Sequence, residues 1–183
     1  MGYFAVIDTE TNWADQVMSI GTVIADRDTF TVITVKYHVL PLECQVGGMY
    51  ENALFPDMPF SPILCSREEA IGDLKAWFSG FGIREIFAYN ACFDRTHLPE
   101  LREYQWFDIM RLAAYRQYNP CIPECADCFS TGRLKRGYGV EPMLRLLSGK
   151  LRYRETHNAV LDALDELSIM RLLKIPLSDY IPL

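Results

Sequence analysis

The order of apolar and polar residues predicts β-strands in the first part of the chain. Residues 3–8 form an apolar, aromatic and β-branched run that ends in Asp8, as in a strand buried on both faces. Two more β-rich stretches, 17–25 and 29–40, are separated by a charged turn at 26–28, which predicts an antiparallel hairpin. Three strands therefore open the chain.

The next segment has no regular pattern until residue 66. The prolines and glycines between residues 41 and 65 predict a long surface loop. Ser66 and Glu69 then match a capping box ahead of apolar residues at helical spacing, so a helix is expected over 66–79. A short apolar strand is expected over 85–90.

Helices are expected to dominate the remainder of the chain. The widest apolar face predicts a helix from about residue 158 to 174, ending before Pro176. A Cys/Pro-rich loop is expected at about 117–137. Three other helices are expected: one over 95–103, one that begins at Asp108 as its cap, and one over 140–147.

This order of elements favours an α/β fold. It predicts a mixed β-sheet, with the first three strands antiparallel, flanked by α-helices on its faces. The 183 residues suit a single domain covering positions 1–183, and no linker or internal repeat is visible.

Composition and charge restrict the function classes. Hydrophobic residues make up 50% of the chain and charged residues 23%, which is typical of a folded globular protein. The net charge of −6 argues against coating of nucleic acid by bulk electrostatics, so any such partner must be held locally. No signal-peptide or membrane-span pattern occurs, so a cytoplasmic location without a membrane partner is expected.

The first candidate for chemistry is a pair of acids near the N-terminus. Asp8 and Glu10 are two residues apart, so a strand would direct both side chains to the same face. Two like charges repel each other unless a cation or a proton lies between them. Asp8-Thr9-Glu10 is therefore a candidate site for a hard metal ion, with a solvated turn as the alternative.

Two later motifs make this interpretation specific. Asn90-Ala91-Cys92-Phe93-Asp94 follows the strand expected over 85–90, and His157-Asn158-Ala159-Val160-Leu161-Asp162-Ala163 opens the last helix. In this order the three motifs resemble those of the DEDDh family of 3′-to-5′ exonucleases, which includes RNase T, oligoribonuclease and the proofreading subunits of bacterial DNA polymerases. The resemblance covers roughly residues 3 to 174.

The resemblance implies a fold, an activity and cofactors. The fold is the ribonuclease-H-like mixed sheet, and the reaction is metal-dependent hydrolysis of phosphodiester bonds at single-stranded DNA or RNA 3′ ends, which releases nucleoside monophosphates. Four carboxylates can hold two divalent ions about 3.5–4 Å apart for an in-line displacement. Oxygen ligands suit Mg²⁺ or Mn²⁺.

The resemblance also assigns roles to individual residues. Asp8 would bridge two metals, Glu10 and Asp162 would complete one site, and Asp94 would support the second. His157 would be the general base, because a histidine pKa of roughly 6.5 leaves a neutral fraction at cellular pH. The chain's other histidines, His38 and His97, and the acid Asp108 are expected to be structural.

Four further residues are expected to bind substrate: Thr11, Trp13, Asn90 and Phe93. Family members often have Thr-Gly or Ala-Gly after the first motif, whereas this chain has Thr11-Asn12-Trp13. In the family this segment lines the pocket for the 3′-terminal nucleotide. Trp13 would either stack on a base or be an ordinary half-buried aromatic residue.

Cysteines and basic residues cluster just before the third motif. Cys121, Cys125 and Cys128 offer a structural Zn²⁺ three thiolates, with a fourth ligand needed from elsewhere; the alternative is reduced thiols in a surface loop. Segment 133–136, with Arg152 and Arg154 further on, is the one dense basic stretch of the sequence. It is interpreted either as a phosphate-contacting patch or as a solvated loop.

Two alternatives to an exonuclease stay open. One is a catalytically weak nucleic-acid-binding module of the same fold, which is disfavoured because binding alone does not need four mutually repelling carboxylates. The other is a ribonuclease-H-like endonuclease, which is disfavoured because the His-x-x-x-x-Asp arrangement is an exonuclease feature in the resemblance. The sequence does not predict an oligomeric state.

Overall fold

The computed structural model describes residues 2–57 and 61–183 of the chain. The strands are β1 (Tyr3–Thr11), β2 (Val17–Asp26), β3 (Val32–Val39), β4 (Ile63–Leu64), β5 (Glu85–Ala88) and β6 (Gln105–Asp108). The helices are α1 (Pro41–Cys44), α2 (Arg67–Phe81), α3 (Cys92–His97), α4 (Met110–Ala113), α5 (Val140–Ser148) and α6 (Ala159–Leu173). Short 3₁₀ helices cover Glu51–Ala53, Pro99–Leu101 and Leu177–Asp179.

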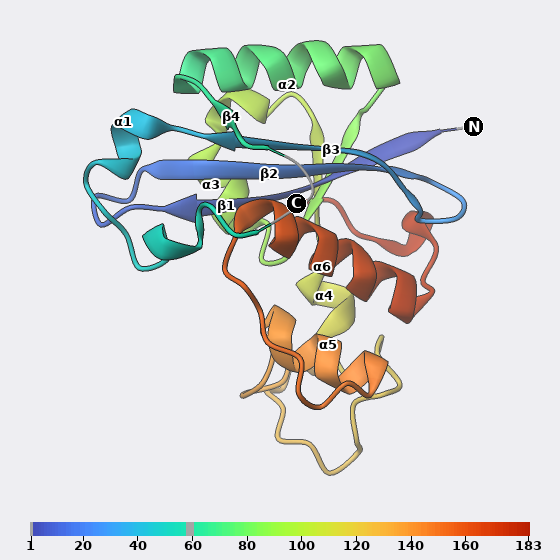
Figure 1. Ribbon diagram of the computed structural model, residues 1–183. Helices are drawn as coiled ribbons and strands as arrows, with labels where there is room; N and C mark the ends of the chain where they lie inside the picture. Colours follow the sequence, from blue (N-terminus) through green and yellow to red (C-terminus); the bar gives the residue numbers. More distant parts are fainter. Residues whose placement is uncertain (1, 58–60) are drawn as a thin grey trace.

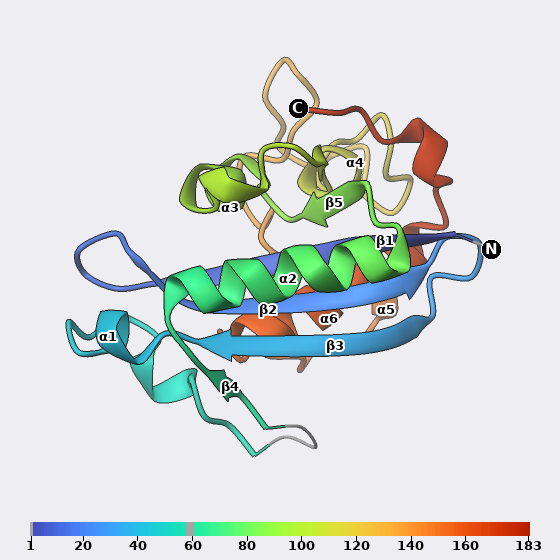
Figure 2. The ribbon, with the colours of Figure 1, turned by 90° about the horizontal axis from the view of Figure 1, so that it is seen from above.

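One mixed sheet organises the molecule, with its strands in the order β4-β3-β2-β1-β5-β6. β1, β2 and β3 are antiparallel, whereas β5 and β6 run parallel to β1 on its other side. Helix α2 covers one face of the sheet and α6 the other, with α5 beyond α6 (Figure 1). Seen from above, α2 lies along β1 and β2 (Figure 2). The predicted fold class is confirmed.

The two cores follow from alternation along β1. Phe4 and Val6 are fully buried in the core beneath α6, whereas Ala5 and Ile7 are fully buried in the core beneath α2. Because successive strand side chains point to opposite faces, one apolar run serves both layers. This explains why residues 3–7 show no polar position.

A glycine allows α6 to approach the sheet closely. A β-carbon added to Gly21 on β2 would lie 2.1 Å from backbone atoms of Ala159 and Val160. No side chain fits there, so only glycine permits this contact. Gly21 pairs with Asp8 across the β1–β2 register, and the first turn of α6 therefore lies beside that acid.

Several expected boundaries were wrong. β1 continues to Thr11 instead of ending at Asp8, and the loop expected over 41–65 contains α1, a 3₁₀ helix and β4, while its residues 58–60 lie outside the described part. The helix expected over 95–103 starts at Cys92 and ends at His97, because Leu98 precedes Pro99 and is disfavoured in the helical conformation. Strand β6 was not expected before the helix at Asp108.

The other expected helices were largely confirmed. Ser66 and Glu69 form the capping box of α2, and Asn158 caps α6 through the backbone amide of Leu161. α5 ends before Gly149, which adopts a left-handed conformation with φ of 72°. Within the described ranges, no helix has the length and apolar character needed to cross a membrane.

Candidate active site

A hollow of about 460 Å³ opens where β1, the turn after β5 and the start of α6 meet. It contains all nine residues expected to act in catalysis or substrate binding. These are Asp8, Glu10, Thr11, Trp13, Asn90, Phe93, Asp94, His157 and Asp162. Residues more than 150 positions apart in the sequence therefore share one site.

β1 supplies the first two acids. Asp8 and Glu10 continue the alternation of Phe4 and Val6, so both lie on the α6 face of the sheet. Glu10 is buried, while Asp8 keeps part of its surface open to the hollow. Their common face agrees with the expectation from their spacing.

A hydrogen bond from Thr9 fixes the side chain of Asp94. Asp94 lies in the first turn of α3, and the Thr9 hydroxyl donates to its Oδ1 at 2.7 Å. The turn that precedes α3 is fixed by Asp108, whose Oδ1 accepts from the backbone amides of Asn90 at 2.9 Å and Met110 at 3.0 Å. Asp108 thus has the structural role expected of it, and Asn90 adopts a left-handed conformation with φ of 62°.

His157 and Asp162 reach the hollow from the start of α6. The buried side chain of Asn158 donates to the Tyr37 hydroxyl at 2.9 Å and to the Ala53 carbonyl at 2.7 Å, which fixes the start of α6 to β3 and to the loop that follows β3. His157 has φ of 57°, an uncommon conformation for histidine that directs the chain into the hollow before the helix begins.

An aromatic ring lies flat on His157. The Tyr50 ring stacks on the imidazole with a centroid separation of 4.1 Å and an interplanar angle of 13°. Tyr50 belongs to the loop expected over 41–65, and no sequence pattern singled it out. Hydrogen bonds from Asn158 to the Ala53 carbonyl and from the Tyr37 hydroxyl to the Leu54 carbonyl hold this loop beside the site.

Three of the expected residues lie within coordination range of a common ion. Glu10, His157 and Asp162 each have a possible ligand atom within 4.8 Å of those of the other two. Oδ1 of Asp162 is buried without a hydrogen-bond partner in the described structure. A buried, unpartnered carboxylate oxygen is costly unless a cation or a proton accompanies it.

Burial and the neighbouring carboxylates raise the pKa values of the acids at the site. Burial, followed by repulsion from Glu155, raises the pKa of Glu10 to about 7 and that of Asp162 to about 9. Burial raises the pKa of Asp94 to about 7 despite the hydrogen bond from Thr9. The pKa of Asp8 lies well above its ordinary range because of burial and the neighbouring acids.

Two more acids belong to this group and were missed from the sequence: Glu155 lines the hollow, and Glu166 is buried beside Asp94 and Asp162. Glu166 follows Asp162 by one helical turn, is 1% exposed, and has one oxygen without a partner among the described residues. Burial, and then the charge of Asp94, raises its pKa well above the ordinary range. Helical spacing from Asp162 was the signal that could have found it.

The donor set therefore fits hard divalent ions. The acids Asp8, Glu10, Asp94 and Asp162 offer only oxygen ligands, which Mg²⁺ and Mn²⁺ prefer. Their raised pKa values and the orphan oxygen of Asp162 show that the charged forms lack compensation from protein groups.

The residues expected to bind substrate form the rim of the hollow. Trp13 is 68% exposed, and Phe93 is also exposed. Asn12 stands where the resemblance has glycine, and its Oδ1 accepts from the amides of Ala14 and Gln16, both at 2.9 Å. This side chain shapes the turn that presents Trp13. Met49 and Tyr89 also line the rim and were not singled out from the sequence.

The cysteines expected as zinc ligands do not gather into a cluster. Cys121 and Cys125 are exposed and Cys128 is half-buried, and among the described residues the only close group of three ligand side chains is that of Glu10, His157 and Asp162. Zn²⁺ binding stays a prediction. His38 is buried against Asp73 and His97 contacts Asp15, as expected of structural histidines.

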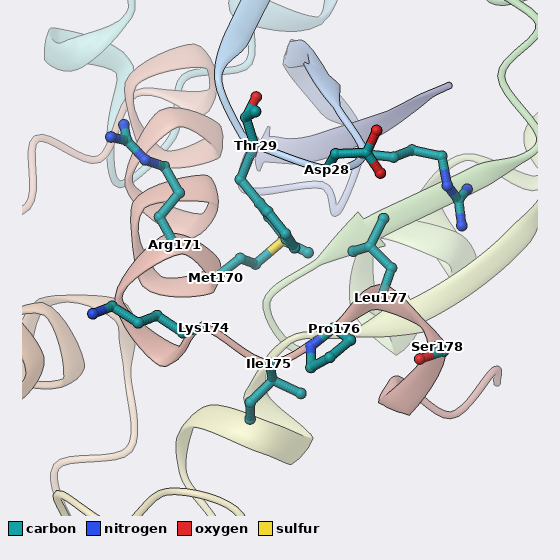
Figure 3. Close-up of a pocket in the computed structure, with 11 residues that line it drawn as sticks. Asp28, Thr29, Met170, Arg171, Lys174, Ile175, Pro176, Leu177 and Ser178 are labelled. Atoms are coloured by element: carbon teal, nitrogen blue, oxygen red, sulfur yellow. The ribbon is translucent and has the colours of Figure 1, made fainter. Parts of the chain in front are cut away.

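A second, larger hollow lies at the other end of α6. Its volume is about 580 Å³, and Met170, Arg171 and Lys174 line it together with the turn at Asp28 and Thr29 and the segment that follows α6 (Figure 3). The cationic groups of Arg171 and Lys174 point away from Met170 in this view. None of the residues expected to act in catalysis lies here.

Comparison with solved structures identifies the fold. The nuclease domain of 3′hExo, a DEDDh family member bound to rAMP, matches with a TM-score of 0.64 and 11% identity over 99% of this chain and 96% of that one. A zinc-bound complex of E. coli exonuclease I with single-stranded DNA matches with a TM-score of 0.59 and 14% identity over 98% of this chain. This protein thus has the ribonuclease-H-like fold of the DEDDh exonucleases.

A third match is a 3′-exonuclease that recognises a histone mRNA stem-loop, with a TM-score of 0.62, 10% identity, and coverage of 99% of this chain and 70% of that one. The chain spans only 42% of the length of E. coli exonuclease I. No family model matches the sequence, and no curated protein matches it either.

Proposed function

We propose that this protein is a metal-dependent 3′-to-5′ exonuclease that acts on single-stranded nucleic-acid ends. The observation that carries the proposal is the meeting of Asp8, Glu10, Asp94, Asp162 and His157 in one hollow of a DEDDh-type fold. The four acids would hold two Mg²⁺ or Mn²⁺ ions. When bound, these ions would supply positive charge for the attacking and leaving oxygens of an in-line displacement.

The side chains of the protein would then carry out three tasks. His157 accepts the proton of a water molecule that attacks the terminal phosphodiester, and the bond from phosphorus to the 3′ oxygen of the preceding nucleotide breaks. Tyr50 holds the imidazole by stacking. Thr11, Trp13, Asn90 and Phe93 surround the terminal nucleotide, and the exposed indole of Trp13 offers a surface on which its base can stack.

The proton chemistry of the site supports a mechanism that needs cations. The acids with raised pKa values release their protons more readily when divalent ions bind, because the ions stabilise the carboxylate form. Ion binding would thus convert a partly protonated, inactive site into the charged one.

The decisive experiment offers 5′-labelled single-stranded RNA and DNA to the protein with Mg²⁺, Mn²⁺ or a chelator. A ladder that shortens one nucleotide at a time, and only with metal, is the expected result. Internal cuts in an RNA–DNA hybrid would instead identify an endonuclease. Binding without cleavage under every metal condition would identify a nucleic-acid-binding module.

A cytoplasmic location is proposed together with this activity. Cell fractionation followed by immunodetection tests it, and recovery of the protein in a membrane or extracellular fraction would contradict it.

A further inference from the structure

A turn rich in basic and aromatic residues adjoins the candidate active site. It comprises residues 128–138, here called the basic turn, and lies within the yellow-to-orange loop below α5 in Figure 1. Three of its residues are cationic, Arg133, Lys135 and Arg136, and none is acidic. In a chain with a net charge of −6, this is a local reversal of sign.

The basic turn has a defined conformation. The amide of Phe129 donates to the Arg133 carbonyl at 2.8 Å, and the amide of Gly132 donates back to the Phe129 carbonyl at 2.9 Å. Gly132 has φ of 87°, which favours glycine at this tight reversal. Leu134 is buried and its amide donates to the Ala114 carbonyl at 2.9 Å, which fixes the turn to the body of the protein.

Cations and aromatic rings alternate on the surface of this turn. The Arg133 guanidinium lies 5.0 Å from the ring centroids of both Phe129 and Tyr138, and the Lys135 ammonium lies 5.9 Å from that of Phe129. Phe129 is 45% exposed and Tyr138 is 40% exposed. Such contacts hold the rings and charges in place while part of each stays open to solvent.

The basic turn is joined directly to the hollow. The Tyr89 hydroxyl donates to the Tyr138 carbonyl at 2.5 Å, and Tyr89 itself lines the hollow beside Asn90. A strand whose end lies among the acids can therefore pass Tyr89 and reach the basic turn. The phosphates upstream of the terminal nucleotide lie outside the hollow, so cationic side chains on the surface are needed to contact them.

We infer that the basic turn is the surface that binds the body of a single-stranded nucleic acid upstream of its 3′ end. Lys135 and Arg136 contact the phosphates, and Phe129 and Tyr138 offer ring surface to unpaired bases. The ion pair of Lys135 with Asp127 at 2.9 Å is exposed and easily exchanged for a phosphate. The inference rests on the proposed function for the direction of the strand.

The test measures binding against strand length. Fluorescein-labelled oligo-dT and oligo-U of 3 and 12 nucleotides are titrated by anisotropy against the protein in a His157→Ala background, which keeps the four acids. The variants are Phe129→Ala and the double Lys135→Ala/Arg136→Ala. The matched control is Arg171→Ala/Lys174→Ala, which removes the same charge from the far end of α6.

Each variant of the turn should bind the 12-mer between about 5-fold and 100-fold more weakly, and the trimer as the parent does. Loss of two phosphate contacts should also reduce the slope of log K against log salt by about 1.4. The control should change neither quantity. A difference between oligo-dT and oligo-U identifies which nucleic acid the surface prefers.

Two outcomes would overturn the inference. One is 12-mer affinity within 2-fold of the parent in both turn variants, and the other is an equal loss in the control, which would show only bulk electrostatics. Hydrolysis of the trimer by the protein with His157 intact tests the exonuclease activity separately from binding at the basic turn. If the trimer is never cut but the 12-mer binds and depends on the turn, the exonuclease assignment fails and the binding surface stands.

Discussion

The two ends of α6 carry opposite chemistry. The hollow at its N-terminal end contains buried acids, whereas the larger hollow at its C-terminal end is lined by exposed Arg171 and Lys174. A helix macrodipole favours this polarity, since its N-terminus attracts negative charge and its C-terminus positive charge. The dipole alone accounts for the cationic residues at the C-terminal end of α6.

The acidic end needs a further explanation. The dipole favours Asp162 in the first turn of the helix, but it does not offset the mutual repulsion of Asp8, Glu10 and Asp94, which belong to other elements. The comparison shows that the volume of a hollow does not indicate which of the two is the functional site. What distinguishes the smaller hollow is the close group of Glu10, His157 and Asp162 and the unpartnered oxygen of Asp162.

The largest expected effect comes from removing one of the acids that we propose to hold the metal ions. Asp8→Asn, Glu10→Gln, Asp94→Asn and Asp162→Asn should each nearly abolish hydrolysis while the fold survives, because each relieves repulsion but loses a ligand. Cleavage assays with circular dichroism check this. The control Arg171→Ala/Lys174→Ala should keep the wild-type rate on short substrates. Near-normal turnover in two of the acid variants would show that the acidic hollow is not the active site.

The next effect concerns His157. His157→Ala should reduce turnover by about 10²–10⁴-fold, the usual contribution of a general base. The increase in thermal stability on adding Mg²⁺ should remain, since the four acids are intact. His38→Gln is the matched control and should cost little activity, because His38 lies outside the hollow and contacts Asp73 of α2. A wild-type rate in His157→Ala would assign the base to another group.

A smaller effect should appear in the pH dependence of stability. The native acids at the site hold protons between about pH 4 and pH 7–9 that the unfolded chain has released, so the free energy of unfolding falls as pH rises through this range. Metal-free protein should therefore lose several degrees of Tm between pH 5 and pH 8. Mg²⁺ should restore them at pH 8 and have little effect at pH 5.

Variants at the two hollows sharpen this test. Asp162→Asn should reduce both the pH-dependent loss and the gain from Mg²⁺, whereas Asp28→Asn at the far hollow should change neither. Scanning calorimetry at several pH values measures all three proteins. A metal-free Tm that rises from pH 5 to pH 8 would contradict the electrostatic interpretation.

Tyr50 should have a modest effect through its stacking on His157. Tyr50→Ala should lower kcat by about 2-fold to 10-fold, the range that an aromatic pair of 0.5–1.5 kcal/mol gives. Tyr50→Phe keeps the ring and should behave as wild type. Equal losses in both variants would show that the hydroxyl, and not the stacking, matters.

The smallest effect is expected at the basic end. Lys174 ends α6 in a left-handed conformation with φ of 56°, where glycine is favoured. Lys174→Gly should therefore stabilise the protein by about 0.5–1 kcal/mol, visible as a Tm increase of roughly 1–4 °C, without changing hydrolysis. A lower Tm would show that the Lys174 side chain stabilises the protein by more than its left-handed backbone conformation destabilises it.

The parts of the fold that the sequence predicted are those with long periodic patterns. The opening strands, α2 and α6 have enough positions to define a period and a cap. β4 has two residues and β6 has four, too few for a period, and both are strands only because a neighbouring strand pairs with them.

The sequence predicted the parts of the site whose residues lie close together in the chain. Asp8 and Glu10 share a strand, and His157 and Asp162 share a helix start, so spacing alone connects each pair. The stacking of Tyr50 on His157 joins residues 107 positions apart. The loop that carries Tyr50 is held by long-range hydrogen bonds, among them those of Asn158 and Tyr37, which no local pattern encodes. The burial of Glu166 likewise becomes apparent only once α6 lies on the sheet.

The close contact of α6 with β2 at Gly21 has a consequence for biosynthesis. The ribosome synthesises Asp8, Glu10 and Asp94 well before His157 and Asp162. The hollow of the candidate site is completed only when the last long helix has been synthesised and packs against Gly21. Premature termination anywhere before residue 157 therefore yields fragments that lack His157 and Asp162 and, with them, part of the proposed site.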